Sequence, residues 1–448
     1  MSANEAYEAY DPLVSRGVTP THSPPPSYWH ATHTAKRYAP LAGSISTDYL
    51  VIGGGYTGLS AAITLAEQQK DVVVVDSNTL GFGCAGRNGG FILSGSGRLS
   101  LSAIADKWGT TVADGMHNEF THAVSLLEDR INRYTMQVDY TPGDYIKIGH
   151  TAKAAKTLFS AATAQHNRYG GVIENVSHNE LRKRLTIAGS HGAVIQPGAC
   201  LHPLKLADEY ARVASYLGAS LYYDSPALDI TEFGNWFKVT TPQGEINTRH
   251  ILIASNAYTP KTFHSLVDKR QFPVQSSIMV TDPLTEEQQH ATGLCRPMSF
   301  MDTRMMKYYY RVLPDGRLLF GGRGAVTGKN ANHTNERKRL YMAMVESFPV
   351  LNGIGMPYFW SGWVSVALDS LPRVYVADNK RMGYAMGYCG SGVSFAAHAG
   401  KRLAQRMLGE DIDDNLPIFA SPLPRYPFSA IRRVALHALY KWAKISNN

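Results

Sequence analysis

The sequence predicts an α/β protein in which a domain built on a parallel sheet hosts an inserted antiparallel sheet. Two observations predict this fold class. Between residues 48 and 76, a short apolar run, a glycine-rich turn, a helical pattern and a second apolar run follow one another, which is typical of a βαβ unit in a parallel sheet. Residues 272–322 instead contain short β-rich runs separated by turn residues, as in antiparallel sheets.

Length and composition agree with a large folded protein and exclude several classes. The chain has 448 residues, of which 44% are hydrophobic and 18% charged, so general disorder is excluded. Its apolar runs are too short for a membrane-spanning helix, and its start lacks the apolar segment of a secretory signal. The four cysteines lie far apart, which argues against a disulfide scaffold or zinc ribbon and indicates a cytoplasmic protein. The net charge of +8 permits anionic partners, but no nucleic-acid-binding motif is present, so we expect no nucleic-acid partner.

The first motif is G-x-G-x-x-G at residues 53–58, directly after the first apolar run. In such a motif Gly53 permits the tight turn, Gly55 lets a pyrophosphate approach the backbone, and Gly58 allows close contact between helix and strand. Asp76 ends the second strand, where its carboxylate can accept hydrogen bonds from an adenosine ribose. The sequence therefore predicts a dinucleotide site, and the acidic residue argues against NADP.

A second glycine-rich run, GFGCAGRNGG at residues 81–90, favours FAD over NAD. A nicotinamide dehydrogenase has no need of this run. A flavin does, because its ring system must pass close to backbone.

Later elements follow from local patterns. Residues 58–69, 114–133 and 204–217 carry apolar residues at helical spacing, and residues 393–408 read as a further helix. The tripeptide Pro314-Asp315-Gly316 stands between two apolar runs and predicts a hairpin turn. Residues 1–26 are rich in proline, serine and threonine, and are expected to form a flexible arm.

The ordered set of motifs resembles the D-amino-acid oxidase (DAO) superfamily of FAD enzymes. Besides the two glycine-rich runs, the resemblance rests on the segments SYW (27–29), YAP (38–40), DYTPG (139–143), LHPLKLA (201–207), ASNAY (254–258), YYR (309–311), LLFGG (318–322), WSG (360–362), GYCGSGV (387–393) and YPF (426–428). Within the superfamily the chain is similar to members that oxidise gamma-glutamylputrescine. It departs from them at Cys84, often a serine, and at Ser391, where the putrescine-type motif has histidine.

The resemblance implies a glutathione-reductase-type, Rossmann-like FAD-binding domain interleaved with an α+β substrate domain. We expect an N-terminal arm (1–44), the FAD-binding domain in three parts (45–125, 192–263 and 365–408), the substrate domain in two parts (126–191 and 264–364), and a C-terminal basic tail (409–448). The FAD is expected to be non-covalent, because no cysteine lies in residues 359–371, where some relatives attach it. The expected cofactor-binding residues are Gly53, Gly55, Tyr56, Thr57, Gly58, Asp76, Ser77, Gly83, Cys84, Arg87, Asn88, Gly89, Gly90, Gly390, Ser391, Gly392 and Val393.

The implied reaction is oxidation of an amine C–N bond to an imine by hydride transfer to flavin N5, with O₂ or a respiratory carrier as the final acceptor. Positioning does most of the work in such a transfer, so no obligatory acid–base pair is expected. Arg323, Tyr309 and Tyr388 are the predicted substrate-positioning residues, and Arg323 could clamp a carboxylate. Arg87 either contacts the flavin or holds its own loop. The histidines show no metal-binding spacing, so no metal is expected.

Three functions remain open on the sequence. The first is oxidation of gamma-glutamylputrescine or a similar carboxylate-bearing amine, and the second is oxidation of a cyclic or secondary amino acid such as pipecolate or proline. The third is a non-catalytic flavin-binding partner protein.

The basic tail predicts a helix over residues 429–444 with an apolar stripe. The stripe consists of Ile431, Val434, Ala435, Ala438 and Trp442. We expect the helix to pack on the FAD-binding domain, with a weak membrane-surface contact as the alternative.

Overall fold

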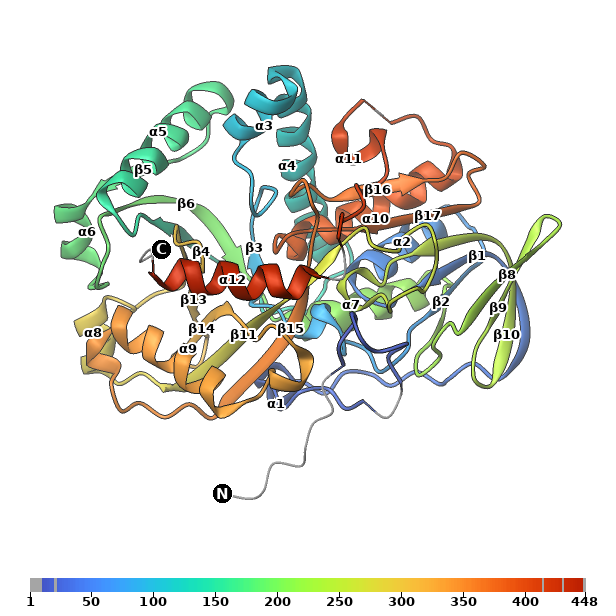
Figure 1. Cartoon of the computed structure of the whole chain (residues 1–448), viewed down its shortest axis with the longest axis horizontal. Coiled ribbons are helices and arrows are strands. Elements are labelled where there is room, and N and C mark those ends of the chain that lie inside the picture. The colour runs from blue at the N-terminus through green and yellow to red at the C-terminus, as the bar shows by residue number, and fades with distance from the viewer. Residues whose placement is uncertain (1–9, 20–21, 413–414, 429–430, 446–448) are drawn as a thin grey trace.

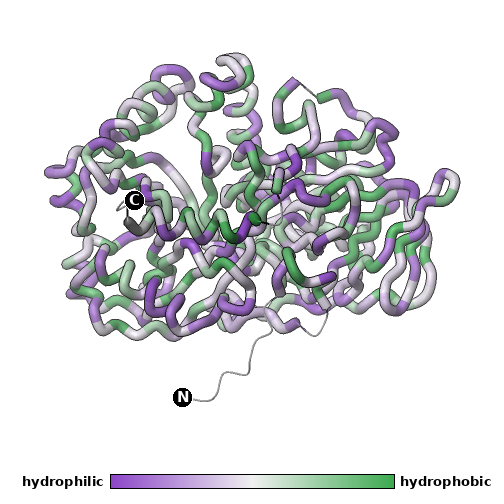
Figure 2. The backbone as a smooth tube through the Cα atoms, in the orientation of Figure 1, coloured by the Kyte–Doolittle hydropathy of each residue, from purple (hydrophilic) through white to green (hydrophobic). Residues whose placement is uncertain are grey.

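The computed structural model describes residues 10–19, 22–412, 415–428 and 431–445. Their strands form two mixed sheets that lie side by side, with helices on their outer faces (Figure 1). Figure 2 shows hydrophobic stretches along the strands and along the helices that cover them. Among the described residues, no helix has the length and hydropathy needed to span a bilayer.

The first sheet is the predicted parallel sheet. Its strand order is β16-β17-β10-β1-β2-β7, and all neighbours are parallel except β16 and β17. Its strands are β1 (Gly43–Ile52), β2 (Val72–Val75), β7 (Ser220–Tyr222), β10 (Gly244–Ile253), β16 (Arg373–Val376) and β17 (Met382–Met386), with β8 (Asp229–Phe233) and β9 (Trp236–Thr240) as a ribbon beside β10. The predicted βαβ unit is confirmed, because α2 (Tyr56–Glu67) connects β1 to β2.

The helices predicted from periodicity are also present. They are α4 (Thr110–Arg133), α7 (Pro203–Tyr216) and α10 (Gly392–Leu408). Helix α10 packs against both α2 and α4. Buried apolar residues of these helices and of the first sheet form one continuous core, which holds the glycine turn after β1 in place.

The second sheet has the order β15-β11-β14-β13-β12-β4-β6-β3, with β5 beside β6. Its neighbours are antiparallel except for the parallel pair β12 and β4. The strands are β3 (Phe91–Ile92), β4 (Thr141–Ile148), β5 (Glu174–Ser177), β6 (Gly192–Cys200), β11 (Phe272–Pro283), β12 (Met298–Asp302), β13 (Tyr309–Val312), β14 (Arg317–Arg323) and β15 (Tyr358–Val366). One face packs on α6 (His178–Arg184) and α9 (Thr334–Ser347), and α8 (Glu286–Thr292) contacts the turn that follows α9.

One expected domain limit differs from the sheet topology. The second part of the FAD-binding domain was expected to begin at residue 192, but β6 pairs with β4 in the second sheet. The chain returns to the first domain at α7, after residue 202. Strand β6 is apolar enough for either sheet, and pairing with a distant strand decides which one it joins.

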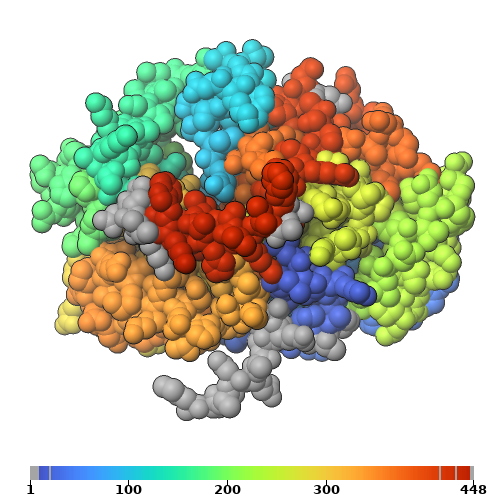
Figure 3. Space-filling model, viewed as in Figure 1, coloured from blue at the N-terminus to red at the C-terminus, as the bar shows by residue number. Residues whose placement is uncertain are grey.

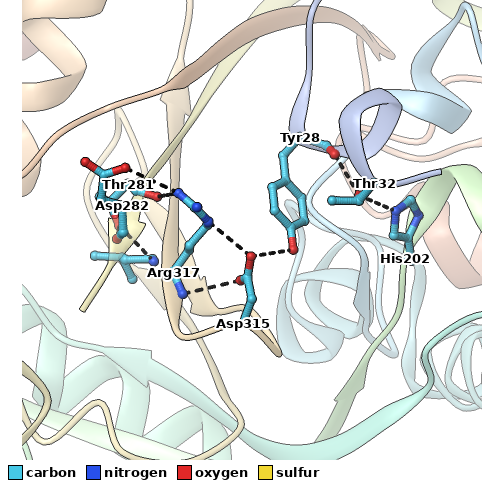
Figure 4. Close-up of polar contacts among 8 residues, drawn as sticks. Tyr28, Thr32, His202, Thr281, Asp282, Asp315 and Arg317 are labelled. Atoms are coloured by element: carbon cyan, nitrogen blue, oxygen red, sulfur yellow. Dashed lines mark hydrogen bonds and ion pairs between the residues drawn. The ribbon is translucent and has the colours of Figure 1, made fainter. Parts of the chain in front are cut away.

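The predicted turn at residues 314–316 joins β13 and β14, and it also anchors the short helix α1 (Tyr28–Thr32) (Figure 4). The Tyr28 hydroxyl donates to Asp315 at 2.9 Å, and Arg317 Nε donates to the same carboxylate at 3.0 Å. At the other end of α1, Thr32 Oγ1 lies 3.1 Å from His202 Nε2, which leads into α7. Helix α1 therefore ties the second sheet to the first domain.

The N-terminal arm is folded where the structure describes it, which corrects the expectation of flexibility for residues 10–19 and 22–26. The Tyr10 ring is 4% exposed and stacks on Tyr258, with 5.9 Å between ring centroids. Trp363 Nε1 donates to the Tyr10 carbonyl at 2.8 Å, and the Asp11 carboxylate accepts from Gly328 N–H at 2.9 Å. Residues 1–9 and 20–21 lie outside the described part of the chain.

The predicted C-terminal helix is α12 (Arg432–Ile445), and it crosses the front of the molecule over the junction of the two domains (Figures 1 and 3). The helix packs on the core of the first domain through Leu436, as expected, but with a different face from the apolar stripe. Leu436 and Ala443, on the opposite face, are buried, whereas Val434 and Trp442 of the stripe are 68% and 54% exposed. The helix is thus held through its inner face, and the stripe faces solvent.

Candidate active site

A cavity of about 1810 Å³ lies between the two sheets. Its walls come from the carboxyl ends of β1 and β2, the N-termini of α2 and α10, and one face of the second sheet. Figure 3 shows the surface hollowed between the cyan segment of α3 (Leu101–Trp108) and α4 and the green segment of α5 (Ala152–Tyr169). Drug-sized ligands usually occupy roughly 300–1,000 Å³, so this cavity has room for a dinucleotide and a substrate together.

The glycine turn is shaped for an anionic ligand. Gly53 has φ of 114°, and a side chain there would meet the backbone of Ala254 at 2.8 Å. At Gly55 a Cβ would meet only Ala85 Cβ, at 3.9 Å, so this position faces open cavity. Gly55 is also the N-cap of α2, where no side chain caps the helix. The first N–H groups of α2 are therefore available to a pyrophosphate.

Asp76 lines the same part of the cavity, as the ribose assignment requires. Its carboxylate accepts hydrogen bonds from Gly54 N–H at 2.7 Å and Asn78 N–H at 3.1 Å. Burial raises the pKa of Asp76 to about 6, although these backbone hydrogen bonds oppose the shift. Further hydrogen-bond donors on a ligand, such as ribose hydroxyls, would stabilise the charged form.

Arg87 holds its own loop, which is one of its two predicted roles. Its Nε donates to the Phe82 carbonyl at 2.6 Å, and its Nη1 donates to the Ser361 carbonyl at 3.1 Å. The guanidinium lies over the Phe82 ring at 4.7 Å from the centroid. Asn88 acts similarly, because its Nδ2 donates to the carbonyl of Cys84 at 3.1 Å. These contacts fix the second glycine-rich run against the cavity.

The N-terminus of α10 forms another wall, close to the first turn of α2. Ser391 Oγ donates to the Gly95 carbonyl at 2.6 Å, and no side chain caps the helix. The Tyr388 hydroxyl lies 2.7 Å from Thr57 Oγ1 on α2, and burial raises the pKa of Tyr388 well above its usual value. Tyr388 lines the cavity with its hydroxyl engaged by the first domain. Its predicted contact with the substrate therefore rests on its ring.

The second sheet contributes a row of side chains across adjacent strands. Register aligns Ile278, Gly321, Tyr309, Met301 and Lys147 on β11, β14, β13, β12 and β4. All of these except Gly321 line the cavity. At Gly321 a Cβ would come within 2.3 Å of the neighbouring aromatic ring, so the missing side chain makes room for that ring.

The three consecutive tyrosines alternate faces, as a strand requires. The Tyr309 hydroxyl lies 2.8 Å from Ser276 Oγ on the cavity side. Tyr310 is 2% exposed on the opposite face, where its ring stacks on Phe300 and Phe320. Of the three tyrosines, Tyr309 is the one that lines the cavity, in agreement with its predicted position.

Arg323, the last residue of β14, presents its side chain to the cavity. No hydrogen bond or ion pair of its guanidinium joins it to another described residue. Burial lowers the pKa of Arg323 from its usual value. A cation held in this way fits the predicted role of binding a carboxylate.

Most of the predicted cofactor residues line the cavity, although no ligand contact tests their roles. The exceptions are Gly58 and Gly90, which lie outside the lining. At Gly58 a Cβ would lie 1.9 Å from the Gly53 carbonyl oxygen, and at Gly90 it would lie 2.2 Å from that of Leu201. Both glycines therefore serve close backbone contacts. In the described part of the chain, no group of three histidine, cysteine or acidic side chains is placed to hold a metal.

Several lining residues were not predicted from the sequence. Among them are Arg98, Lys147, Lys307 and residues 16–19 of the N-terminal arm. For Lys147 a signal existed, since it follows Tyr145 at the two-residue spacing of one strand face. Arg98, Lys307 and residues 16–19 lie in irregular segments, where the sequence has no periodic pattern that would indicate which way a side chain points.

Comparison with known proteins supports the fold and the cofactor. The family model described as "DAO: FAD dependent oxidoreductase" matches residues 48–406. Gamma-glutamylputrescine oxidoreductase of Escherichia coli (strain K12) is 31% identical over 410 residues, which cover 90% of this chain and 92% of that protein.

Among solved structures, glycine oxidase from Geobacillus kaustophilus superposes with a TM-score of 0.70 at 18% identity, covering 85% of this chain and 99% of that one. L-proline dehydrogenase from P. horikoshii superposes with a TM-score of 0.68 at 18% identity, covering 84% and 96%. At this identity the two structures show the shared fold. The family match, the identity to the E. coli protein and a cavity shaped for a dinucleotide agree, and the chain belongs to the DAO family of FAD-dependent oxidoreductases.

Proposed function

We propose that this FAD-dependent enzyme oxidises the C–N bond of an amine that carries a carboxylate, with gamma-glutamylputrescine as the first substrate to test. Bound FAD supplies the hydride acceptor. The observation that carries the proposal is the charge of the cavity. Among the described residues that line it, nine are lysine or arginine and one, Asp76, is acidic. The basic ones are Arg16, Arg87, Arg98, Lys147, Arg168, Lys261, Arg304, Lys307 and Arg323. Arg168 and Arg304 are paired with aspartates outside the lining, and the remaining cations still exceed the single acidic residue.

This charge selects among amines. A bare diamine such as putrescine carries only positive groups, which the cavity repels, whereas a carboxylate can bind a guanidinium in a charge-assisted pair. Arg323 is the best-placed partner, because its guanidinium is not paired with another described residue. The 31% identical E. coli protein, a gamma-glutamylputrescine oxidoreductase, supports the same substrate class.

The cavity also favours the neutral form of the amine. Loss of a hydride from carbon requires the nitrogen lone pair, so an ammonium group is unreactive. Apolar liners such as Phe91 and Ile278 and the excess of cations both disfavour an ammonium, and they lower the pKa of a bound amine. Tyr309 and the row around it would set the face and distance of approach. No protein acid–base pair is needed.

An anaerobic stopped-flow experiment tests the proposal. We expect gamma-glutamylputrescine to bleach the flavin far more efficiently than putrescine. Equal bleaching by putrescine would mean a simple amine oxidase, and efficient bleaching by proline or pipecolate alone would mean an amino-acid oxidase. If no amine bleaches the flavin, the remaining interpretation is a flavin-binding protein without this activity. Reoxidation with O₂ or with a quinone then identifies the electron acceptor.

The variant Arg323→Ala tests the carboxylate contact. A charge-assisted hydrogen bond contributes about 1.5–3 kcal/mol, so we expect a rise of about 10- to 100-fold in the apparent Kd of the acidic amine. The limiting rate of bleaching should change less, because the contact holds ground state and transition state alike. Arg182→Ala, at an exposed position on α6, is the matched control. An unchanged Kd in Arg323→Ala would assign the carboxylate to another residue.

A further inference from the structure

Three cations on the substrate side of the cavity remain unexplained by a single carboxylate at Arg323. They are Lys147 on β4, Lys307 between β12 and β13, and Arg98 in the loop before α3. No ion pair or side-chain hydrogen bond joins any of them to another described residue. The neighbouring carboxylate, Asp302, is already bound to Arg304 and to the Tyr308 N–H.

These cations lie close enough to repel one another. Burial, followed by the charges of Lys147, Arg323 and Arg98, lowers the pKa of Lys307 to about 8. Burial also lowers the pKa of Lys147. Lys147 and Lys307 are partly buried and Arg98 is exposed at the rim of the cavity. Partly buried cations without a counter-charge destabilise a folded protein, so an arrangement of this kind is typical of a site whose ligand supplies the opposite charge.

Sheet geometry sets the spacing of the site. Lys147 and Arg323 stand on the same face of the second sheet, and their strands β4 and β14 are separated by β12 and β13. Neighbouring strands lie about 4.8 Å apart, and the register places Lys147 level with Gly321, two residues from Arg323. The two backbone positions are therefore roughly 15 Å apart. Long side chains reaching inward from both leave room for a small diacid between them.

We propose that Lys147, Lys307 and Arg98 form a second anion subsite beside Arg323, and that the substrate is an amine bearing two acidic groups. This inference rests on the proposed function and narrows its substrate class, because a diacid amine should then be preferred to gamma-glutamylputrescine, which carries a single carboxylate. One carboxylate would bind Arg323, and the other would bind the lysine pair. A monoacid would neutralise one of the four positive charges of Arg323, Lys147, Lys307 and Arg98. A diacid would neutralise two of them.

Binding of simple carboxylates to the oxidised holoenzyme tests the subsite without turnover. The probes are the monocarboxylate butyrate and the dicarboxylates succinate, glutarate and adipate. Binding of each is measured from the change in flavin absorbance and from the shift in Tm. We expect at least one dicarboxylate to bind about tenfold or more tightly than butyrate. If none binds more tightly than butyrate, the inference fails.

Single variants then locate the second carboxylate. Lys147→Met and Lys307→Met should each abolish the advantage of the dicarboxylate and leave butyrate binding unchanged. Arg323→Ala should weaken both kinds of ligand, and Lys153→Met, at an exposed position on α5, should change neither. Equal weakening of butyrate and dicarboxylate by the lysine variants would show a general field effect and overturn the subsite.

A further measurement does not depend on any ligand. Lys147→Met removes a partly buried cation that has no counter-charge and nearly keeps the length of the side chain, so it should raise the Tm of the ligand-free holoenzyme. A lower Tm would show that the lysine is paired in solution.

Failure of this inference is distinguishable from failure of the proposed function. Amines that bleach the flavin without any preference for diacids overturn only the subsite, and preference for diacids without bleaching overturns only the reaction.

Discussion

Gly55 is the residue of the first glycine turn at which a side chain would meet the cavity instead of the protein. Gly53 and Gly58 on either side are enclosed by backbone, so substituting them would disturb the fold itself. Glycine therefore occurs in this turn for two reasons: at position 55 it leaves space for the ligand, and at positions 53 and 58 it allows close backbone contacts. Position 55 is therefore the cleanest residue at which to test the cofactor site.

We predict that Gly55→Val abolishes FAD retention while the protein stays folded. The valine side chain would occupy the space that the pyrophosphate needs, but its Cβ would touch only Ala85. The FAD content of the purified protein by absorbance, together with far-UV circular dichroism, checks the prediction. A folded variant that keeps the wild-type amount of FAD would contradict the placement of the dinucleotide.

At the scale of elements, a buried ionic cluster joins α4 to α10. The Glu119 carboxylate accepts hydrogen bonds from His398 Nε2 at 2.7 Å and from Arg402 Nη2 at 2.6 Å. Burial acts to raise the pKa of Glu119, but these hydrogen bonds and charges outweigh it and lower the pKa to about 2. Since α10 also provides one end wall of the cavity, the cluster positions that wall.

Removing this carboxylate should destabilise the protein. We predict that Glu119→Gln lowers the free energy of unfolding at pH 7 by about 3 kcal/mol, as expected when one member of a buried ion pair is lost. Because the folded pKa lies below the unfolded value near 4.5, this stabilisation is full above pH 4.5 and is lost as the pH falls toward 2. Urea titrations at pH 7 and pH 3 test this, with Asp129→Asn, exposed on the same helix, as the control. A difference between variant and wild type that does not shrink at pH 3 would contradict the linkage.

Helix α12 presents its apolar stripe to solvent, which is unusual for a helix docked on a globular protein. Ile431, Val434, Leu439 and Trp442 are each more than 40% exposed, and Lys441 is exposed beside them. Such a face is typical of a helix that lies on a membrane surface.

We predict weak binding to anionic vesicles through this face. The wild type should sediment with phosphatidylglycerol vesicles and be released by salt, and Trp442→Ser should reduce the bound fraction severalfold. Tyr216→Ser, which removes an exposed aromatic ring from α7, should bind like the wild type. Absence of wild-type sedimentation at low salt would exclude the contact.

At the scale of the whole molecule, the cavity assigned to the cofactor lies between two domains that come from interleaved parts of the chain. We predict that FAD is released into the supernatant when the protein is precipitated with acid. Gly362 lines the cavity where some relatives carry an attaching cysteine, and burial raises the pKa of the Cys84 thiol to about 11, so that thiol stays protonated. Yellow colour that remains with the precipitate would contradict this.

Free FAD should also raise the Tm of the apoprotein, because it binds only the folded state.

The local sequence determined the first βαβ unit, the hairpin at residues 314–316 and the cofactor turn, because turn glycines, helical periods and buried strand runs act over a few residues. It also indicated Tyr309 and Arg323, through strand alternation and a strand end. Tertiary structure alone decided that β6 joins the second sheet, that residues 16–19 line the cavity, and that α12 turns its apolar stripe outward. It also brought Lys147, Lys307 and Arg98 to one place, because the strand and the two loops that carry them are far apart in the chain and meet only once the second sheet and the two domains are assembled.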